Sequence, residues 1–143
     1  NQVFTINNQE RDYYKEGGGL TFSILEPVKY FEKVVKTSDS PTLFYINRKG
    51  VKKVIPNEQV FLSYKNRFED IQVIPLAMLE RYPVFHAIYL SGDKKIFTID
   101  QGTNTKHWIR SLEAFQRLHL DWGRVLPVNQ TEFNTYPEGS PIE

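Results

Sequence analysis

Residues 54–88 read VIPNEQVFLSYKNRFEDIQVIPLAMLERYPVFHAI, and residues 108–142 read WIRSLEAFQRLHLDWGRVLPVNQTEFNTYPEGSPI. The two stretches align without a gap at an offset of 54, and their apolar positions match: Ile55 with Ile109, Phe61 with Phe115, and Phe68 with Trp122. Self-similarity at one fixed period is typical of tandem structural repeats. We therefore predict that one unit of about fifty residues occurs twice in this chain.

The alignment continues upstream at an offset of 53, where Ser38 falls on Ser91 and Ile46 on Ile99. One residue has therefore been added in the turn that follows, which covers residues 47–50 in the first copy and 100–104 in the second. Both turns are polar and contain Gly, and such turns of β-hairpins tolerate changes in length. A hairpin is therefore expected in each unit.

The rest of the unit is predicted from local patterns. Residues 43–46 and 51–55 are rich in aromatic and β-branched residues, which favours the two strands of the hairpin. Asn57 and Ser111 predict N-caps of short helices over 58–64 and 112–118. Residues 71–74 and 125–128 predict a strand before a Tyr-Pro turn, so each unit is β-β-α-β in outline. The fold class is α+β, mainly β, with two tandem hairpin, short-helix and strand repeats.

Three segments are expected along the chain: an N-terminal arm with a β extension (1–33), repeat 1 (34–87) and repeat 2 (88–143), with the repeats in one compact body. Residues 20–25, LTFSIL, follow three glycines and predict a strand. The arm either caps the open edge of repeat 1 or adds a strand to a neighbouring subunit. In the second case the expected contact residues are Val3, Phe4, Ile6, Tyr13 and Tyr14.

Composition excludes several classes of protein. The formal net charge of +1 provides no global field that would attract nucleic acid. The absence of cysteine excludes disulfides and thiol chemistry. No apolar run reaches the roughly 18 residues that span a bilayer.

Because the chain begins at Asn1 and its only methionine is Met78, we expect a processed product or a fragment, most simply after removal of an export signal. A secreted or cell-surface location follows.

No pattern for catalysis, a cofactor or a metal can be identified. His86, His107 and His119 lack the spacing of a zinc-binding helix. Residues 17–19, GGG, are not followed by Lys and Ser or Thr, so they are a poor phosphate cradle. Polar residues that could do chemistry differ between the two copies, whereas packing residues match. We therefore expect a protein that is not an enzyme and has no cofactor or metal.

Two polar features have alternative interpretations. Arg48, Lys49, Lys52 and Lys53 flank one hairpin and could contact an anionic glycan, but lysines on the solvent face of a strand also prevent edge aggregation, which we favour. Residues 129–131, NQT, form a glycosylation sequon.

The chain contains ten Phe, eight Tyr and two Trp. Core packing is the favoured role of these aromatic residues, because so small a unit cannot close a core without large side chains. The alternative is a row of aromatic platforms for sugar rings. Trp108 and Trp122 are the candidates for such a glycan platform.

The repeat has a recurring pattern: an aromatic strand that ends in Tyr-Ile or Thr-Ile, a Gly turn, Lys-His-Trp-Ile at 106–109, a helix with Phe, Asp-Trp-x-x-Val at 121–125, and Tyr-Pro-x-Gly at 136–139. It resembles tandem repeat modules of secreted and cell-surface bacterial proteins. The resemblance covers residues 34–143 and is cleaner in the second copy. It implies an extracellular location and modular use, and no particular reaction.

Two functions are therefore expected. The first is a non-enzymatic, exported structural protein that forms a homo-oligomer or polymer, as a subunit of a surface layer, fibre or tube or as an adhesive module, with the arm making subunit contacts. The alternative is a module that binds a cell-wall or surface glycan through its aromatic platforms.

Overall fold

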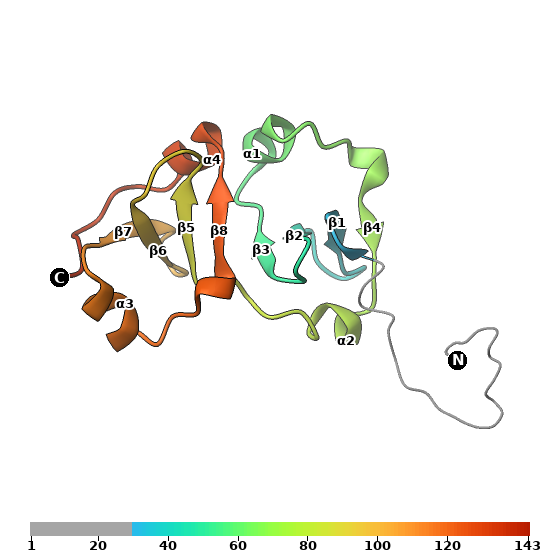
Figure 1. Cartoon of the computed structure of the whole chain (residues 1–143). Helices are drawn as coiled ribbons and strands as arrows, with labels where there is room; N and C mark the ends of the chain where they lie inside the picture. Colours follow the sequence, from blue (N-terminus) through green and yellow to red (C-terminus); the bar gives the residue numbers. More distant parts are fainter. Residues whose placement is uncertain (1–29) are drawn as a thin grey trace, which may run out of the picture. The chain divides into compact units, whose positions relative to one another are not determined.

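The computed structural model describes residues 30–143, of which residues 32–143 form one compact unit. Within these residues the chain forms two four-stranded sheets and four short α-helices (Figure 1). The predicted α+β, mainly β class is confirmed. The arm, with Val3, Phe4, Ile6, Tyr13 and Tyr14, lies outside the described residues, as does the strand predicted at 20–25.

The first sheet contains β1 (Lys33–Lys36), β2 (Phe44–Ile46), β3 (Lys52–Val54) and β4 (Gln72–Val73) in the order β3-β2-β1-β4. β2 is antiparallel to both β1 and β3, whereas β4 is parallel to β1. Helix α1 (Glu58–Ser63) and the 3₁₀ helix η2 (Phe68–Asp70) connect β3 to β4, and α2 (Leu76–Leu79) follows β4.

The second sheet repeats this topology. It contains β5 (Ala87–Leu90), β6 (Ile96–Asp100), β7 (Thr105–Ile109) and β8 (Val125–Val128) in the order β7-β6-β5-β8, with β5 and β8 parallel. Helix α3 (Leu112–Arg117), the 3₁₀ helix η3 (Trp122–Arg124) and α4 (Gln130–Thr135) occupy the corresponding places. Strands β1 and β5, like helices α1 and α3, begin 54 positions apart.

Each unit contains more than the β-β-α-β outline predicted from the sequence. A strand precedes the hairpin, and a helix follows the last strand where only a Tyr-Pro turn was expected. The leading strands carry adjacent buried residues, Val34-Val35 and Ala87-Ile88, so they lack the alternation by which a half-buried strand is recognised. Helix α4 is capped by Asn129, whose Oδ1 accepts a hydrogen bond from the Glu132 backbone N–H at 2.8 Å.

The predicted hairpins and helix caps are confirmed. β2 pairs with β3, and β6 with β7. The Asn57 Oδ1 accepts from the Val60 backbone N–H at 2.9 Å, and the Ser111 Oγ accepts from Ala114 at 3.0 Å. The left-handed residue at the end of the turn is at the equivalent position in both hairpins: Gly50 has φ +83°, and Asn104 has φ +58°.

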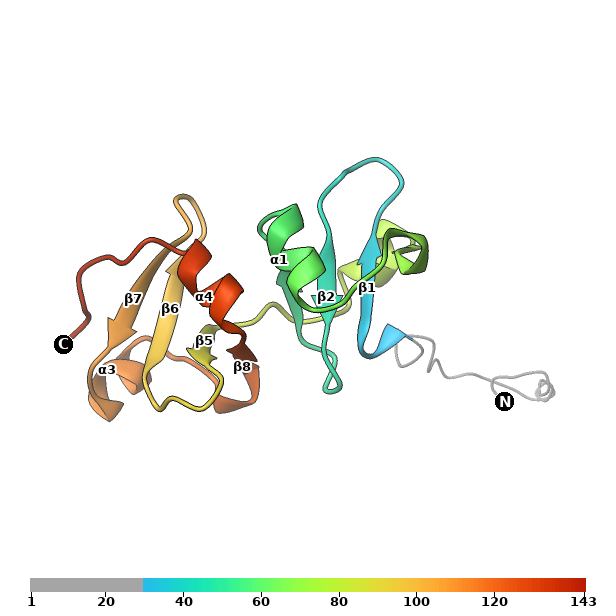
Figure 2. The same cartoon turned by 90° about the horizontal axis from the view of Figure 1, so that it is seen from above.

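The second sheet lies between two helices (Figures 1 and 2). One face carries Phe97 and Trp108, which pack with Phe133 of α4. The opposite face carries Ile96 and Ile109, which pack with Phe115 of α3. This division follows from the alternation of side chains along a strand. The first of these cores also includes two residues of the first half of the chain, Val51 and Phe85.

None of the helices in the described part of the chain is both long and apolar enough to cross a membrane.

Candidate binding site

Trp122 is an exposed aromatic side chain held in a fixed orientation. It opens η3, which is capped by Asp121 through a hydrogen bond from the Gly123 N–H at 2.8 Å. The indole stacks on the buried ring of Phe115, with centroids 4.0 Å apart and planes inclined by 17°. Nevertheless 58% of Trp122 is exposed. One face of the indole is therefore supported by the core, and the residue as a whole remains accessible.

The first repeat has the same pair in another form. Phe68 packs on buried Phe61 with centroids 4.7 Å apart and planes inclined by 32°, and Phe68 is 54% exposed. The inner ring of each pair is core, as predicted, whereas the outer ring is not. The inner ring already fills the space against the sheet, so the outer ring covers it from the solvent side.

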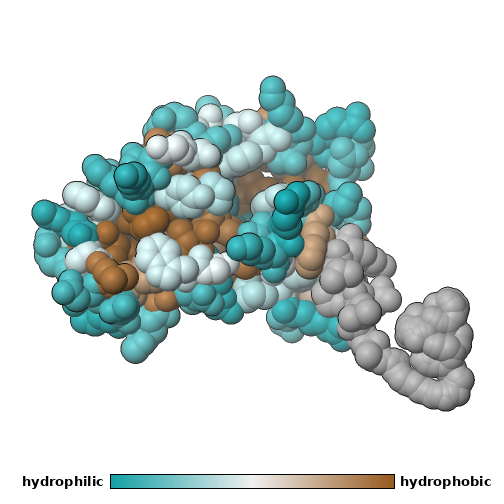
Figure 3. All heavy atoms as spheres, in the orientation of Figure 1, coloured by the Kyte–Doolittle hydropathy of each residue, from teal (hydrophilic) through white to brown (hydrophobic). Residues whose placement is uncertain are grey.

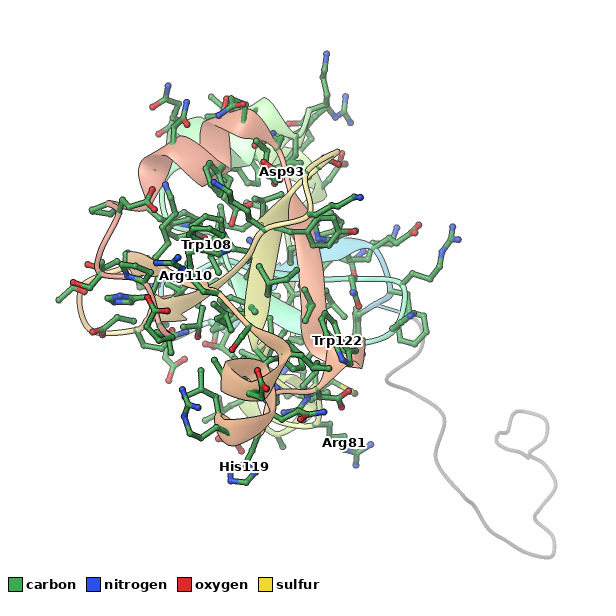
Figure 4. All side chains as sticks on the ribbon, turned by 60° about the vertical axis from the view of Figure 1, so that its left-hand side comes forward. Arg81, Asp93, Trp108, Arg110, His119 and Trp122 are labelled. Carbon is green, nitrogen blue, oxygen red and sulfur yellow. The ribbon has the colours of Figure 1, made fainter. Side chains whose placement is uncertain are left out.

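Trp108 is half-buried on β7, and two cationic side chains of the protein lie over its ring. The Lys95 Nζ lies 4.5 Å from the ring centroid, and the guanidinium carbon of Arg110 lies 5.2 Å from it, which are distances for cation–π attraction. Figure 4 shows Trp108 beside Arg110, with Trp122 farther away near α3. The two predicted platform residues therefore differ in how open their rings are.

Both tryptophans nevertheless line one shallow groove with a volume of about 380 Å³. Ile96, Leu112 and Phe115 contribute apolar surface to it, and its three cations are Lys94, Lys95 and Arg110. Figure 3 shows apolar surface over the second repeat on the face seen in Figure 1. Repeat 1 has Pro41, Thr42 and Pro56 at the positions of the three cations. The cationic groove therefore belongs to repeat 2 alone.

A second, deeper hollow of about 670 Å³ lies between the two repeats. Tyr45 and Tyr64 of the first repeat line it together with Tyr89 and Trp122 of the second. Trp122 therefore borders both hollows. The sequence analysis identified Trp122 but none of the three tyrosines, because no local sequence pattern indicates that they line one hollow.

A buried ion pair lies at the edge of this deeper hollow. Glu132 of α4 is fully buried and pairs with Lys53 of β3, which is only 5% exposed. The Tyr64 hydroxyl donates to Glu132 Oε1 at 2.7 Å, and the Tyr136 hydroxyl donates to Oε2 at 2.5 Å. A buried charge of this kind is tolerated only when it is paired and hydrogen-bonded. The group Lys53, Tyr64, Glu132 and Tyr136, here called the junction cluster, joins the two repeats.

The junction cluster also changes the acidity of its tyrosines. Burial and the adjacent Glu132 carboxylate raise the pKa of Tyr64 and of Tyr136 well above the ordinary value for tyrosine. Both hydroxyls therefore remain protonated donors to the carboxylate at neutral pH. The contact is extended by Asn129, whose backbone N–H donates to the Tyr64 hydroxyl at 2.9 Å and whose Nδ2 donates to Ser63 Oγ at 3.0 Å. The sequon asparagine thus uses its side chain in this junction.

The interpretation of Lys52 and Lys53 as solvent-facing strand lysines is wrong. Lys53 is buried against Glu132, and the half-buried Lys52 donates from Nζ to the Leu79 carbonyl at 2.9 Å. The sequence did hold a signal of this arrangement. Glu132 aligns with Met78, so a charge occupies a position that is apolar in the other copy. Such a difference indicates a contact that only one copy makes.

The three histidines do not share a contact with one another. His86 contacts the Asp121 backbone N–H at 3.0 Å and Arg124 Nη1 at 2.8 Å, and burial followed by the Arg124 charge lowers the pKa of this histidine. His107 Nδ1 lies 2.7 Å from the Ser140 carbonyl oxygen, and His119 is exposed. Among residues 30–143 no group of three or more His, Cys, Asp or Glu is arranged to hold a metal ion.

Comparison with known proteins gives no match: no family model, no curated protein and no solved structure is significantly similar to this chain. The resemblance to repeat modules of secreted bacterial proteins therefore stays an expectation from the sequence.

Proposed function

We propose that this protein is a non-enzymatic, exported module that binds carbohydrate, with Trp122 as its principal platform. The observation that carries the proposal is the combination of high exposure and rigid support at Trp122, which stacks on buried Phe115 at the junction of two hollows. A flat ring that is already fixed in place loses little conformational entropy when a ligand packs on it.

The chemistry of the surroundings suits a sugar. One face of a pyranose ring presents C–H groups that pack on an aromatic ring, while its edge presents hydroxyls that need hydrogen-bond partners. Pockets of this kind combine aromatic walls with a few placed polar groups. The two hollows beside Trp122 offer aromatic, amide and charged side chains together. A cell-wall or surface glycan is therefore the proposed partner.

The other function expected from the sequence, self-association through the arm, stays a prediction, because its contact residues lie outside the described part of the chain. One sheet edge to which a neighbouring subunit could add a strand is closed, however. Residues 138–142 cover the outer edge of β7: the Ile142 N–H donates to the Trp108 carbonyl at 2.7 Å, and the Arg110 N–H donates to the Ile142 carbonyl at 2.9 Å. An edge that is already paired is not available to a neighbour. Carbohydrate binding is therefore favoured.

A polysaccharide pull-down tests the proposal with a matched pair of variants. The wild type, Trp122→Ala and Phe68→Ala are incubated with peptidoglycan sacculi, chitin and cellulose, and the bound fraction is measured. We expect wild type and Phe68→Ala to be retained by at least one polymer and Trp122→Ala to lose roughly tenfold or more in affinity, about the contribution of a well-placed aromatic contact.

Phe68→Ala is the control because it removes an equally exposed outer ring from an equivalent stack. Thermal unfolding of both variants checks that each is folded. Retention of Trp122→Ala at the wild-type level, or retention of no variant by any polymer, contradicts the proposal.

A further inference from the structure

We infer that the hollow between the repeats continues the carbohydrate site past Trp122, so that the ligand is an oligosaccharide chain of several units and not a single sugar. The inference rests on the proposed function and makes it more specific. Its starting point is that Trp122 lines both the shallow groove and the deeper hollow. A sugar stacked on this ring can extend into either space.

The deeper hollow has the size of a binding pocket. Its volume of about 670 Å³ lies within the range of roughly 300–1,000 Å³ in which proteins enclose small ligands. The groove on the other side of Trp122 adds about 380 Å³. A single pyranose ring, which is about as large as an indole, cannot fill both spaces. A chain of linked rings can.

Two phenol hydroxyls in this hollow make no hydrogen bond within the described residues. Tyr45 and Tyr89 are half-buried and line the hollow from the first and second repeats, and neither hydroxyl makes a hydrogen bond to any residue of 30–143. Sugar hydroxyls both donate and accept, so they match two phenols that also do both.

Other polar side chains that line the hollow differ in whether they already make hydrogen bonds within the protein. Lys53 and Glu132 form an ion pair, and the Tyr64 hydroxyl donates a hydrogen bond to Glu132. The junction cluster therefore shapes the hollow, and we expect no ligand hydrogen bonds from it. Asn66 donates from Nδ2 to the Phe61 carbonyl at 2.9 Å, and its side-chain oxygen makes no hydrogen bond to residues 30–143. The ligand contacts expected here are therefore Tyr45, Tyr89 and the Asn66 oxygen, together with Trp122, which also lines the hollow.

Titration calorimetry with N-acetylglucosamine oligomers, from the monosaccharide to the hexasaccharide, tests this inference on the full chain. We expect affinity to rise by about tenfold or more between the monosaccharide and the longer oligomers, because only a chain reaches both hollows. Tyr45→Phe and Tyr89→Phe each remove one hydroxyl and keep the ring. Each is expected to weaken binding of the long oligomers by roughly three- to tenfold, the value of one hydrogen bond.

The same two variants should leave the melting temperature unchanged, since neither hydroxyl bonds to the described protein. Affinity that does not rise with length, or long-oligomer binding that neither Tyr→Phe variant weakens, overturns the extended site. Both results leave the proposed function standing as long as polysaccharide retention still depends on Trp122. Loss of that dependence is a failure of the proposed function itself, so the two failures are distinguishable.

Discussion

The two repeats have the same strand order and the same pairing directions, yet three differences between them matter for their contacts. Met78 in repeat 1 is replaced by Glu132 in repeat 2, Val54 by Trp108, and the connecting segment 84–88 by the C-terminal segment 138–142. The first difference makes the junction, and the second contributes to the groove. In the third, both segments pair with the outer strand of their hairpin, at Lys52 and at Lys106, but only the C-terminal segment continues along the strand to Ile109. Packing positions thus maintain the fold, while the positions that differ give each repeat its own contacts.

One polar position is shared by both repeats and shows what a structural lysine looks like. Lys52 Nζ donates to the Leu79 carbonyl at the end of α2, and Lys106 Nζ donates to the equivalent Phe133 carbonyl of α4 at 2.8 Å. Burial lowers the pKa of both lysines. A cation near the last carbonyls of a helix interacts favourably with its dipole. Residues shared between the copies therefore belong to the fold even when they are charged.

The largest effect is expected from Glu132→Met, which gives repeat 2 the residue that repeat 1 has at this position. Lys53 then remains buried without a counter-charge, which costs about 3–5 kcal/mol of unfolding free energy. Urea-induced unfolding followed by far-UV circular dichroism measures the change.

The control for this variant is the double substitution Lys53→Met/Glu132→Met. Replacing both members of a buried ion pair by apolar residues of similar volume is often nearly neutral, so most of the lost stability should return. If the double variant is as unstable as Glu132→Met, the ion pair is not what distinguishes the junction.

The covered edge of β7 is expected to respond to Gly139→Ala. A Cβ at this position would lie 2.5 Å from His107 Cε1 and 2.6 Å from Thr105 Cγ2, so the segment 138–142 must move away from the strand. Overpacking of this kind costs about 1–3 kcal/mol. Hydrogen exchange should accelerate at the Ile142 amide, which donates to the Trp108 carbonyl.

Gly102→Ala is the matched control, because its Cβ would meet nothing closer than Asp100 Oδ1 at 3.5 Å. It should leave Ile142 exchange unchanged. Equal exchange in Gly139→Ala and wild type would show that the segment does not depend on this close approach.

The junction cluster predicts a loss of stability in alkali. The pKa of Tyr136 is raised from its ordinary 10.0, so the folded protein retains a proton that the unfolded chain releases above pH 10. Stability therefore falls as pH rises beyond 10, by at most about 1.4 kcal/mol per pH unit for this group. The lowered pKa values of Lys52 and Lys106 act in the opposite direction and offset part of the fall.

Tyr136→Phe should reduce this dependence and leave the part due to Tyr64, whose pKa is also raised. Urea unfolding at pH 9 and at pH 11 measures the dependence as the difference between two midpoints. A slope equal to that of the wild type would mean that Tyr136 ionises as readily in the folded protein as in the unfolded chain.

The smallest effect is expected on the stability of the two aromatic stacks. Trp122→Ala and Phe68→Ala each remove the exposed outer ring of a stacked pair. Each should lower the free energy of unfolding by about 0.5–1.5 kcal/mol. Similar melting temperatures for the two variants would show that the stacks are equivalent in folding. A much larger loss at Trp122 would assign that ring to the core and weaken its proposed role in binding.

The sequence was informative where structure is local. The offset of 54 located both units, and Asn57 and Ser111 marked the starts of two helices that the structure confirms. The strands β1 and β5 were missed because they are short and lack alternation. The helix α4 was missed because it has only six residues, too few to show a helical pattern of apolar positions.

The site was only partly predictable for a different reason. Trp108 and Trp122 were selected as flat, large side chains, but their exposure depends on which rings lie beneath them. The pair Lys53 and Glu132 is separated by 79 positions, and no local pattern connects the two residues. Burial of a charge is decided by a tertiary partner, so only the comparison of the two copies at Met78 and Glu132 could have indicated it.

The junction cluster also fixes the order in which the repeats can follow each other along a chain. If repeat 2 preceded repeat 1, His107 would meet Met78 at the new boundary, because these residues occupy the positions of Lys53 and Glu132. The lysine and the glutamate would then lie at opposite ends of the permuted molecule, each without its counter-charge. The ion pair therefore forms only when repeat 1 precedes repeat 2, so two units of similar fold cannot be exchanged.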